Sequence, residues 1–194
     1  MNIKIGIIGA SGYWGRKILK AISSLSNAEV LICSGYSNLK RLNEVIESSY
    51  PLSLSKPQKT LNHREIIHSP VIDAVIISTP AEKHFSIACE ALREGKHVCL
   101  GKPMCLRVDN AHELAQLAES KDRILFVDHT YLHSKCIHFI KDKIDSYEIG
   151  KNIYYHSHRT QIGIYRSFSV LWDLGPHDLS IVKFLFSKLI VWYS

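Results

Sequence analysis

The first eighteen residues constrain the fold most, because a strand pattern gives way to a helix pattern across a run of glycines. An apolar, isoleucine-rich run begins at Ile3, which is typical of a buried parallel strand. Gly9, Gly12 and Gly15 follow, and helical spacing of apolar residues starts at Ile18. This is the layout of a dinucleotide-binding βαβ unit, in which the glycine turn lets the backbone approach a pyrophosphate and helix N–H groups face the anion. The spacing G-x-x-G-x-x-G departs from the commoner G-x-G-x-x-G, so a turn without ligand is the alternative.

Strand-like apolar runs alternate with helical patterns throughout the first 128 residues. Five strands are predicted, one starting at Ile3 and four over residues 30–33, 73–78, 97–100 and 123–127. Helices are predicted over residues 38–48, 62–68, 82–94 and from a cap at Asp109, whereas residues 49–60 are interpreted as an irregular surface loop. The alternation predicts an α/β fold with a doubly wound parallel sheet, a Rossmann domain that binds NAD(P), over residues 1–128.

The ends of the predicted strands carry the first candidate ligand residues. Right-handed crossovers place four of these ends along the edge where ligands bind in such sheets, namely Gly9, Ser34, Ser78 and Leu100. Polar or glycine-bearing turns fall at all of them, which supports the dinucleotide hypothesis beyond the glycine motif. Thr79, Pro80 and His84 come next along the chain and fit either a ligand site or an ordinary turn.

A lysine follows the fourth predicted strand, between Gly101 and Pro103. At the end of a parallel strand, the ammonium of Lys102 would face the ligand crevice, where it can bind a hydroxyl or polarise a carbonyl. A solvated surface lysine is the alternative interpretation.

A second reactive group is predicted near the C-terminal end, in the segment that runs from Trp172 to Asp178. Asp173 and His177 are four residues apart and share a face if a helix starts here, with Pro176 tolerated in its first turn. A carboxylate beside an imidazole fixes the tautomer of the ring, as a general acid or base requires. An Asp–His capping pair without chemistry is the alternative, and Asp178 is expected to face the first-turn N–H groups of the helix.

The pattern changes after residue 128. A helix is predicted over residues 134–146, a strand with one exposed face over 152–162, a turn and helix over 172–187, and the start of a strand over 189–193. Residues 129–194 are therefore expected to be part of an α+β substrate domain. A lone strand needs neighbours to pair its backbone, so the domain is expected to be incomplete at its C-terminal end.

Composition narrows the classes of partner. The net charge is +6, but the lysines and arginines are scattered, so no nucleic-acid partner is expected and a small anionic ligand fits the sign. The five cysteines include no C-x-x-C, which favours reduced thiols and a cytoplasmic protein. Neither a signal peptide nor a membrane span is predicted. Two histidine pairs, one at 129 and 133 and one at 156 and 158, lack further ligands at zinc spacing, so no metal is expected.

Together these motifs resemble the Gfo/Idh/MocA family of NAD(P)-dependent oxidoreductases, over nearly the whole chain to about Phe186. The sequence G-Y-W-G at 12–15 is similar to members that act on nucleotide-linked sugars, such as UDP-N-acetylglucosamine 3-dehydrogenases. The sequence S-T-P at 78–80 with His84 resembles the cofactor-side turn, and G-K-H-V at 95–98 leading into G-K-P at 101–103 resembles the G-K-H-V…E-K-P signature. D-H-T-Y-L at 128–132 and L-W-D-L-G-P-H-D-L at 171–179 resemble segments of the substrate domain, the latter most specifically.

The resemblance implies roles for these residues. Lys102 would lie near the nicotinamide and the reacting hydroxyl, His177 would take the hydroxyl proton, and Asp173 would orient one of the two. His129 and Arg159 would bind the substrate, with Arg159 on its phosphates. The expected cofactor-binding residues are Gly9, Ser11, Gly12, Tyr13, Trp14, Gly15, Ser34, Ser78, Thr79, Pro80, His84 and Lys102. The implied function is hydride transfer between NAD(P) and a secondary hydroxyl of a sugar, with a nucleotide-linked sugar as substrate.

Three departures from the family pattern bear on that function. The glycine turn is one residue longer than in the nucleotide-sugar subgroup. The glutamate of E-K-P is replaced by Gly101, which removes a carboxylate that would help to hold the lysine. The second domain of the family continues through further strands that form a dimerisation sheet, so a homo-oligomer is expected of a full-length counterpart and is in question for this chain.

The end of the second predicted strand bears on the choice between NAD and NADP. NAD-binding sheets usually end the second strand with Asp or Glu, whereas here Ser34 takes that place and Lys40 and Arg41 follow, which favours NADP slightly. A truncated or non-catalytic NAD(P)-binding protein is one rival. An enzyme like N-acetylglutamyl-phosphate reductase, which uses a catalytic cysteine, is the other.

Overall fold

The computed structural model describes residues 2–35, 38–51, 54–150, 154–159 and 169–186. The chain divides into two compact units, Met1–Val127 and Asp128–Ser194. Among the described helices, none has the length and apolar character that crossing a membrane requires.

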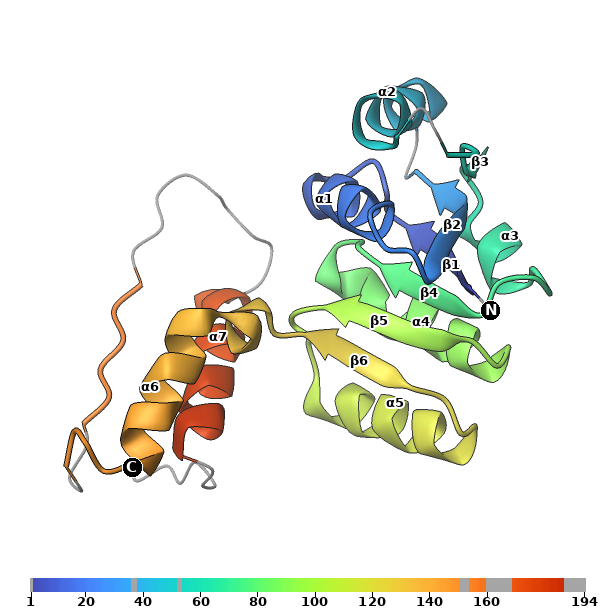
Figure 1. Ribbon diagram of the computed structural model, residues 1–194. Helices are drawn as coiled ribbons and strands as arrows, with labels where there is room; N and C mark the ends of the chain where they lie inside the picture. Colours follow the sequence, from blue (N-terminus) through green and yellow to red (C-terminus); the bar gives the residue numbers. More distant parts are fainter. Residues whose placement is uncertain (1, 36–37, 52–53, 151–153, 160–168, 187–194) are drawn as a thin grey trace. The chain divides into compact units, whose positions relative to one another are not determined.

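The described part of the first unit is built on a six-stranded parallel sheet (Figure 1). Its strands are β1 (Ile3–Ile8), β2 (Ala28–Ser34), β3 (Gln58–Thr60), β4 (Ala74–Ile77), β5 (His97–Gly101) and β6 (Leu125–Asp128). They lie in the order β3-β2-β1-β4-β5-β6, in which the direction of winding reverses between β1 and β4. This is the Rossmann order, and its reversal point is where ligands bind. The predicted doubly wound α/β fold is confirmed.

Helices cover the two faces of the sheet unequally. On one face, α3 (His63–Ile67), α4 (His84–Arg93) and α5 (Val108–Ser120) enclose the larger core, in which Val75, Leu92 and Leu100 are fully buried or nearly so. On the other face, α1 (Tyr13–Ile22) and α2 (Leu39–Ser49) pack over β1 and β2 through Leu19 and Ile46. A 3₁₀ turn (Ala81–Lys83) precedes α4.

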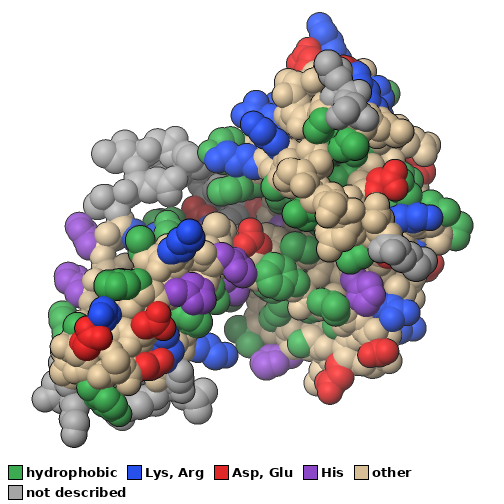
Figure 2. All heavy atoms as spheres, viewed as in Figure 1, with side chains coloured by type: hydrophobic (Ala, Val, Ile, Leu, Met, Phe, Trp, Pro, Cys, Tyr) green, Lys and Arg blue, Asp and Glu red, His purple; other side chains and the backbone are tan. Residues whose placement is uncertain are grey.

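The described helices of the first unit do not cover the second face over β4, β5 and β6. Side chains of these strands line an apolar groove of about 600 Å³, together with residues of β1. Ile124 and Phe126 in this groove are 65% and 45% exposed. Figure 2 shows hydrophobic side chains gathered on the surface over this part of the sheet.

Two predictions in this unit need correction. The segment 49–60 is not wholly irregular, because Gln58–Thr60 forms β3 and pairs with β2. Asp109 lies in the first turn of α5, whose N-cap is Arg107. Asn38, the first residue of the helix predicted over 38–48, is the N-cap of α2, and its side chain accepts a hydrogen bond from the Arg41 N–H at 3.1 Å.

Lys96, in the G-K-H-V segment, stabilises the fold through hydrogen bonds to the backbone. It is 7% exposed, and its ammonium donates to the carbonyl oxygens of Ser69 and Ile72 at 2.7 and 2.8 Å. These bonds tie the start of β5 to the loop before β4, far along the strands from the ligand edge.

The regular elements in the described part of the second unit are all helical. They are a 3₁₀ turn (Thr130–His133), α6 (Lys135–Asp145) and α7 (Val170–Phe186). The strand predicted over 152–162 is wrong where it can be seen, because residues 154–159 are neither helix nor strand; its ends and the strand predicted over 189–193 lie outside the described residues. Since α7 begins at Val170, Pro176 lies well inside it and not in its first turn.

Candidate cofactor and active site

The glycine turn after β1 is held too tightly for side chains at two of its positions. Gly9 has a φ of +89°, and a Cβ there would lie 2.7 Å from the Ser78 carbonyl oxygen. A Cβ at Gly15 would lie 2.2 Å from the carbonyl oxygen of Gly9, so α1 packs directly against the turn. The N–H groups of Gly9 and Ala10 donate to the Ser34 carbonyl at 3.0 and 2.9 Å, which joins the turn to the end of β2.

The arrangement fits a dinucleotide. Gly12 occupies the N-cap of α1 and offers no side chain to cap it, and N–H groups in the first turn of a helix lack partners within the helix. Two hydroxyls at the same edge, those of Ser34 and Thr79, are buried and have no hydrogen-bond partner among the described residues. Buried polar atoms are normally paired, so these two hydroxyls can each accept or donate a hydrogen bond to a polar ligand. The first unit can therefore hold NAD(P) along the ends of β1, β2 and β4.

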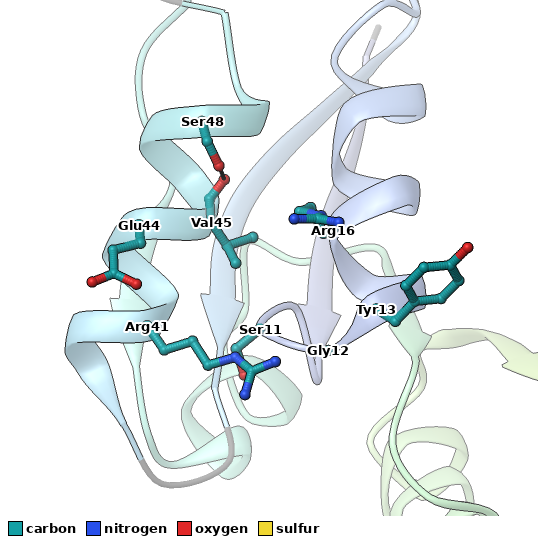
Figure 3. Close-up of a pocket in the computed structure, with 8 residues that line it drawn as sticks. All are labelled: Ser11, Gly12, Tyr13, Arg16, Arg41, Glu44, Val45 and Ser48. Carbon is teal, nitrogen blue, oxygen red and sulfur yellow. Dashed lines mark hydrogen bonds between the residues drawn. The ribbon is translucent and has the colours of Figure 1, made fainter. Parts of the chain in front are cut away.

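A pocket of about 270 Å³ lies between α1 and α2 beside this turn (Figure 3). Figure 3 shows the Arg41 side chain extending from α2 toward Ser11, and Arg16 reaching from α1 into the space between the helices. The carboxylate of Glu44 points away from the Arg41 guanidinium. The remaining lining residues are Gly12, Tyr13, Val45 and Ser48. Two guanidinium groups and two hydroxyls suit an anionic oxygen cluster such as a phosphate.

Tyr13 and Trp14, both predicted to bind the cofactor, lie at the start of α1 with 60% and 53% of their surfaces exposed. Their rings meet edge to face, and the Lys17 ammonium lies 4.5 Å from the Tyr13 ring centre and 5.1 Å from that of Trp14. Tyr13 lines the pocket between α1 and α2, whereas Trp14 is not among its lining residues.

His84 is buried, with 2% of its surface exposed. Its Nδ1 lies 2.9 Å from the Pro103 carbonyl oxygen and its Nε2 lies 3.0 Å from that of Thr79. Both ring nitrogens therefore face backbone carbonyl oxygens, and neither is left to bind a cofactor. His84 can influence a cofactor only by holding the two loops that it contacts.

Lys102 follows the last residue of β5 and is partly buried. It stands at the ligand edge, two strands from β1. A Cβ at the preceding Gly101 would meet the Cε1 of His84 at 3.9 Å, an ordinary contact, so the glycine is not required sterically.

In the second unit, Asp173 and His177 lie four residues apart in α7, as one helical face requires. The Tyr131 ring packs edge to face against His177, with ring centres 4.9 Å apart. Sequence reasoning did not single out Tyr131, although it lies in the D-H-T-Y-L segment. Lys102 belongs to the first unit, so a site that joins it to Asp173 and His177 stays a prediction.

Arg159 forms an ion pair with the carboxylate of Asp178. Its Nε donates to Asp178 Oδ2 at 2.7 Å, and its Nη1 donates to the Tyr131 hydroxyl at 3.3 Å. Asp178 also accepts from the hydroxyls of Ser157 and Tyr155, at 2.8 and 3.2 Å. The hydrogen bond to Asp178 is the largest cause of a raised pKa of Arg159. Asp178 therefore binds residues 155–159 and not the first-turn N–H groups of its own helix, and Arg159 is not an open phosphate receptor in this structure.

His129, the other predicted substrate residue, precedes the 3₁₀ turn of the second unit. Burial lowers the pKa of its imidazole, and the nearby Asp128 offsets part of this effect. Its Nδ1 is buried and has no hydrogen-bond partner among the described residues. A neutral ring with a vacant nitrogen can accept or donate one bond to a substrate hydroxyl.

Three cysteines are poor nucleophiles. Burial raises the pKa of Cys33 to about 12 and that of Cys105 to about 11, and it also raises the pKa of Cys89. Because the thiolate is the reactive form, these residues do not support the reductase that depends on a catalytic cysteine.

Comparisons with known proteins agree with the fold and assign the chain to a family with an NAD-binding Rossmann domain. The family model described as "Oxidoreductase family, NAD-binding Rossmann fold" (GFO_IDH_MocA) matches residues 3–129.

Scyllo-inositol 2-dehydrogenase (NAD(+)) of Bacillus subtilis is 28% identical over 92% of this chain and 52% of its own length. The dTDP-3,4-didehydro-2,6-dideoxy-alpha-D-glucose 3-reductase of Saccharopolyspora spinosa is 25% identical over 77% of this chain and 43% of its own length. The crystal structure of an NAD-binding protein from Listeria innocua superposes with a TM-score of 0.80 over 95% of this chain and 55% of its own, and at 21% identity it supports the fold alone. The chain spans about half the length of the curated relatives it matches.

Proposed function

Because the chain belongs to the Gfo/Idh/MocA family of oxidoreductases with an NAD-binding Rossmann fold, we propose that it transfers a hydride between NAD(P) and a secondary hydroxyl of a sugar. The observation that carries the proposal is the ligand edge of the sheet. There a closed glycine turn, two buried hydroxyls that no described residue hydrogen-bonds, and Lys102 lie at the ends of neighbouring strands.

A nucleotide-linked sugar is the proposed substrate. One relative is named for a nucleotide-linked sugar and another for a free cyclitol, so both present a ring hydroxyl or ketone to the cofactor. The segments 12–15 and 171–179 favour the nucleotide-linked class. Because Asp178 already holds Arg159, the phosphates of such a substrate need another cation or a rearranged pair.

The residues divide the chemistry as follows. When bound, NAD(P) supplies the hydride acceptor or donor. Lys102 donates a hydrogen bond to the reacting oxygen and stabilises negative charge on it. His177 takes the hydroxyl proton during oxidation and returns it during reduction, and Asp173 in the same helix orients its ring.

Turnover by the purified chain tests this proposal. With UDP-N-acetylglucosamine and either NAD⁺ or NADP⁺, we expect the absorbance of the reduced cofactor to rise. Scyllo-inositol serves as the comparison substrate. A rise with scyllo-inositol alone would contradict the nucleotide-linked class. Tight binding of NAD(P)H without turnover of any sugar would favour a non-catalytic cofactor-binding protein.

We further propose that NADP is the preferred cofactor. Ser34 ends β2 where NAD-binding sheets usually carry an acidic residue, so no carboxylate there repels a 2′-phosphate. Arg41 and Arg16 line the adjoining pocket, and both suit that phosphate. One relative is named for NAD⁺, so the relatives do not decide the question.

Arg41→Ala is expected to weaken NADP⁺ binding roughly tenfold or more and to leave NAD⁺ binding within about twofold, because a charge-assisted bond to phosphate contributes about 1.5–3 kcal/mol. Isothermal titration with both cofactors measures this. Lys40→Ala removes the same charge from the neighbouring position, which does not line the pocket, and should change neither affinity much. Tighter binding of NAD⁺ than of NADP⁺ by the unmodified chain would refute the preference.

A further inference from the structure

The imidazole of His84 lies between two loops that follow neighbouring strands. Thr79 lies in the loop after β4 and Pro103 in the loop after β5. The ring reaches the carbonyl oxygens of both, at 3.0 and 2.9 Å, from its place at the start of α4. With 2% of its surface exposed, His84 makes these contacts where water does not compete.

The chemistry of these two contacts is specific to a ring with nitrogens at opposite sides. Carbonyl oxygens only accept hydrogen bonds, so a ring nitrogen binds its carbonyl only when that nitrogen carries a hydrogen. A neutral imidazole donates to one carbonyl, whereas a protonated ring donates to both. An apolar ring of the same size would leave two buried carbonyl groups without this partner.

Each of the two loops carries a residue that bears on the cofactor. The Thr79 hydroxyl is buried and has no hydrogen-bond partner among the described residues, although the Thr79 carbonyl does. Lys102 immediately precedes Pro103. The position of Pro103 therefore determines where the backbone of Lys102 ends, and the position of Thr79 determines where the Thr79 hydroxyl can meet a ligand.

We propose that His84 is a positioning residue that holds the Thr79 and Pro103 loops at a set separation and so preorganises the nicotinamide half of the cofactor site. This inference rests on the proposed function, since it assumes that NAD(P) binds at the ligand edge. The two halves of a Rossmann sheet each bind one mononucleotide. His84 serves the half made by β4 and β5, whereas the pocket between α1 and α2 serves the adenosine half.

Binding of two ligands to His84→Phe tests the proposal. NADPH occupies both halves, whereas 2′,5′-ADP occupies the adenosine half alone. We expect His84→Phe to weaken NADPH binding roughly tenfold, because a buried carbonyl loses its N–H donor, and to leave 2′,5′-ADP binding within about twofold. His84→Gln should recover part of the NADPH affinity, because its amide nitrogen carries two N–H donors.

His97→Phe is the matched control. His97 begins β5 at the opposite end of the sheet, and its Nδ1 accepts a hydrogen bond from the Ile124 N–H at 3.0 Å. Replacing His97 should lower the thermal unfolding midpoint, and it should not change the affinity for NADPH relative to the affinity for 2′,5′-ADP. Equal weakening of both ligands in His84→Phe and His84→Gln, or no weakening of either, would overturn the positioning role. Failure of the unmodified chain to bind NADPH or NADH would instead refute the proposed function.

Discussion

Lys102→Met is expected to lower turnover by roughly 10²- to 10⁴-fold, the range that a positioned proton-transfer or charge-stabilising group contributes. The affinity for NADPH should stay within about threefold, because methionine keeps the apolar stem of the side chain. Steady-state rates with the sugar substrate and isothermal titration with NADPH separate these effects. The loss should fall on kcat more than on KM, since the ammonium acts on the reacting oxygen in the transition state.

Lys121→Met supplies the matched control. Lys121 is an exposed lysine at the C-terminal end of α5, so its replacement should leave kcat and the affinity for NADPH unchanged. If Lys102→Met kept the turnover of the unmodified chain, Lys102 would be a surface lysine at the end of β5, and the proposed chemistry would need another group on the reacting oxygen.

Asp178→Asn is expected to lower the free energy of unfolding by about 1–3 kcal/mol at neutral pH. Asp178 accepts hydrogen bonds from Arg159, Ser157 and Tyr155, and an amide can accept at only one of its two ends. The ion pair is protected, with 25% and 23% of the two side chains exposed. Asp145→Asn breaks an exposed pair with Lys141 on α6 and should cost only a few tenths of a kcal/mol.

The contribution of Asp178 to the free energy of unfolding is expected to decrease as the pH falls. Burial alone raises the pKa of its carboxyl, but hydrogen bonds from Arg159 and Ser157 outweigh burial and hold the pKa below its ordinary value. A depressed pKa contributes stability that is fully present above about pH 4 and is lost as the pH falls through the value in the folded state. Urea unfolding at about pH 7 and about pH 3 should show the gap between wild type and Asp178→Asn narrowing in acid. A gap that stayed constant would mean that the charge of Asp178 does not stabilise the fold.

The sheet was predictable because buried parallel strands are almost continuously apolar. β1 and β4 carry runs of Ile and Val that are typical of buried parallel strands. The glycines between β1 and α1 indicate the turn that follows the first strand. β3 escaped prediction because Gln58–Thr60 has no apolar pattern and depends on its pairing with β2. Edge strands of this kind are stabilised by tertiary context that a local pattern does not encode.

The roles of individual polar residues were less predictable than their positions. The family resemblance implies that His84 and Arg159 are ligand residues, but their partners in the structure are backbone carbonyls and a carboxylate. Arg16 was missed for the opposite reason, since it resembles any exposed helix residue until α2 is placed beside α1. Spacing indicates which residues share an edge or a face, but only the fold shows whether a side chain has already found a partner.

The open apolar groove over β4, β5 and β6 limits how the stability of this chain can be measured. Ile124 and Phe126 present aromatic and aliphatic surface in the folded protein. A fluorescent dye that reports apolar surface would bind there before any unfolding occurs, so its signal would start high and mask the transition. Far-ultraviolet circular dichroism, which follows the helices of both units, is the appropriate signal for comparing the variants of Asp178 and His84.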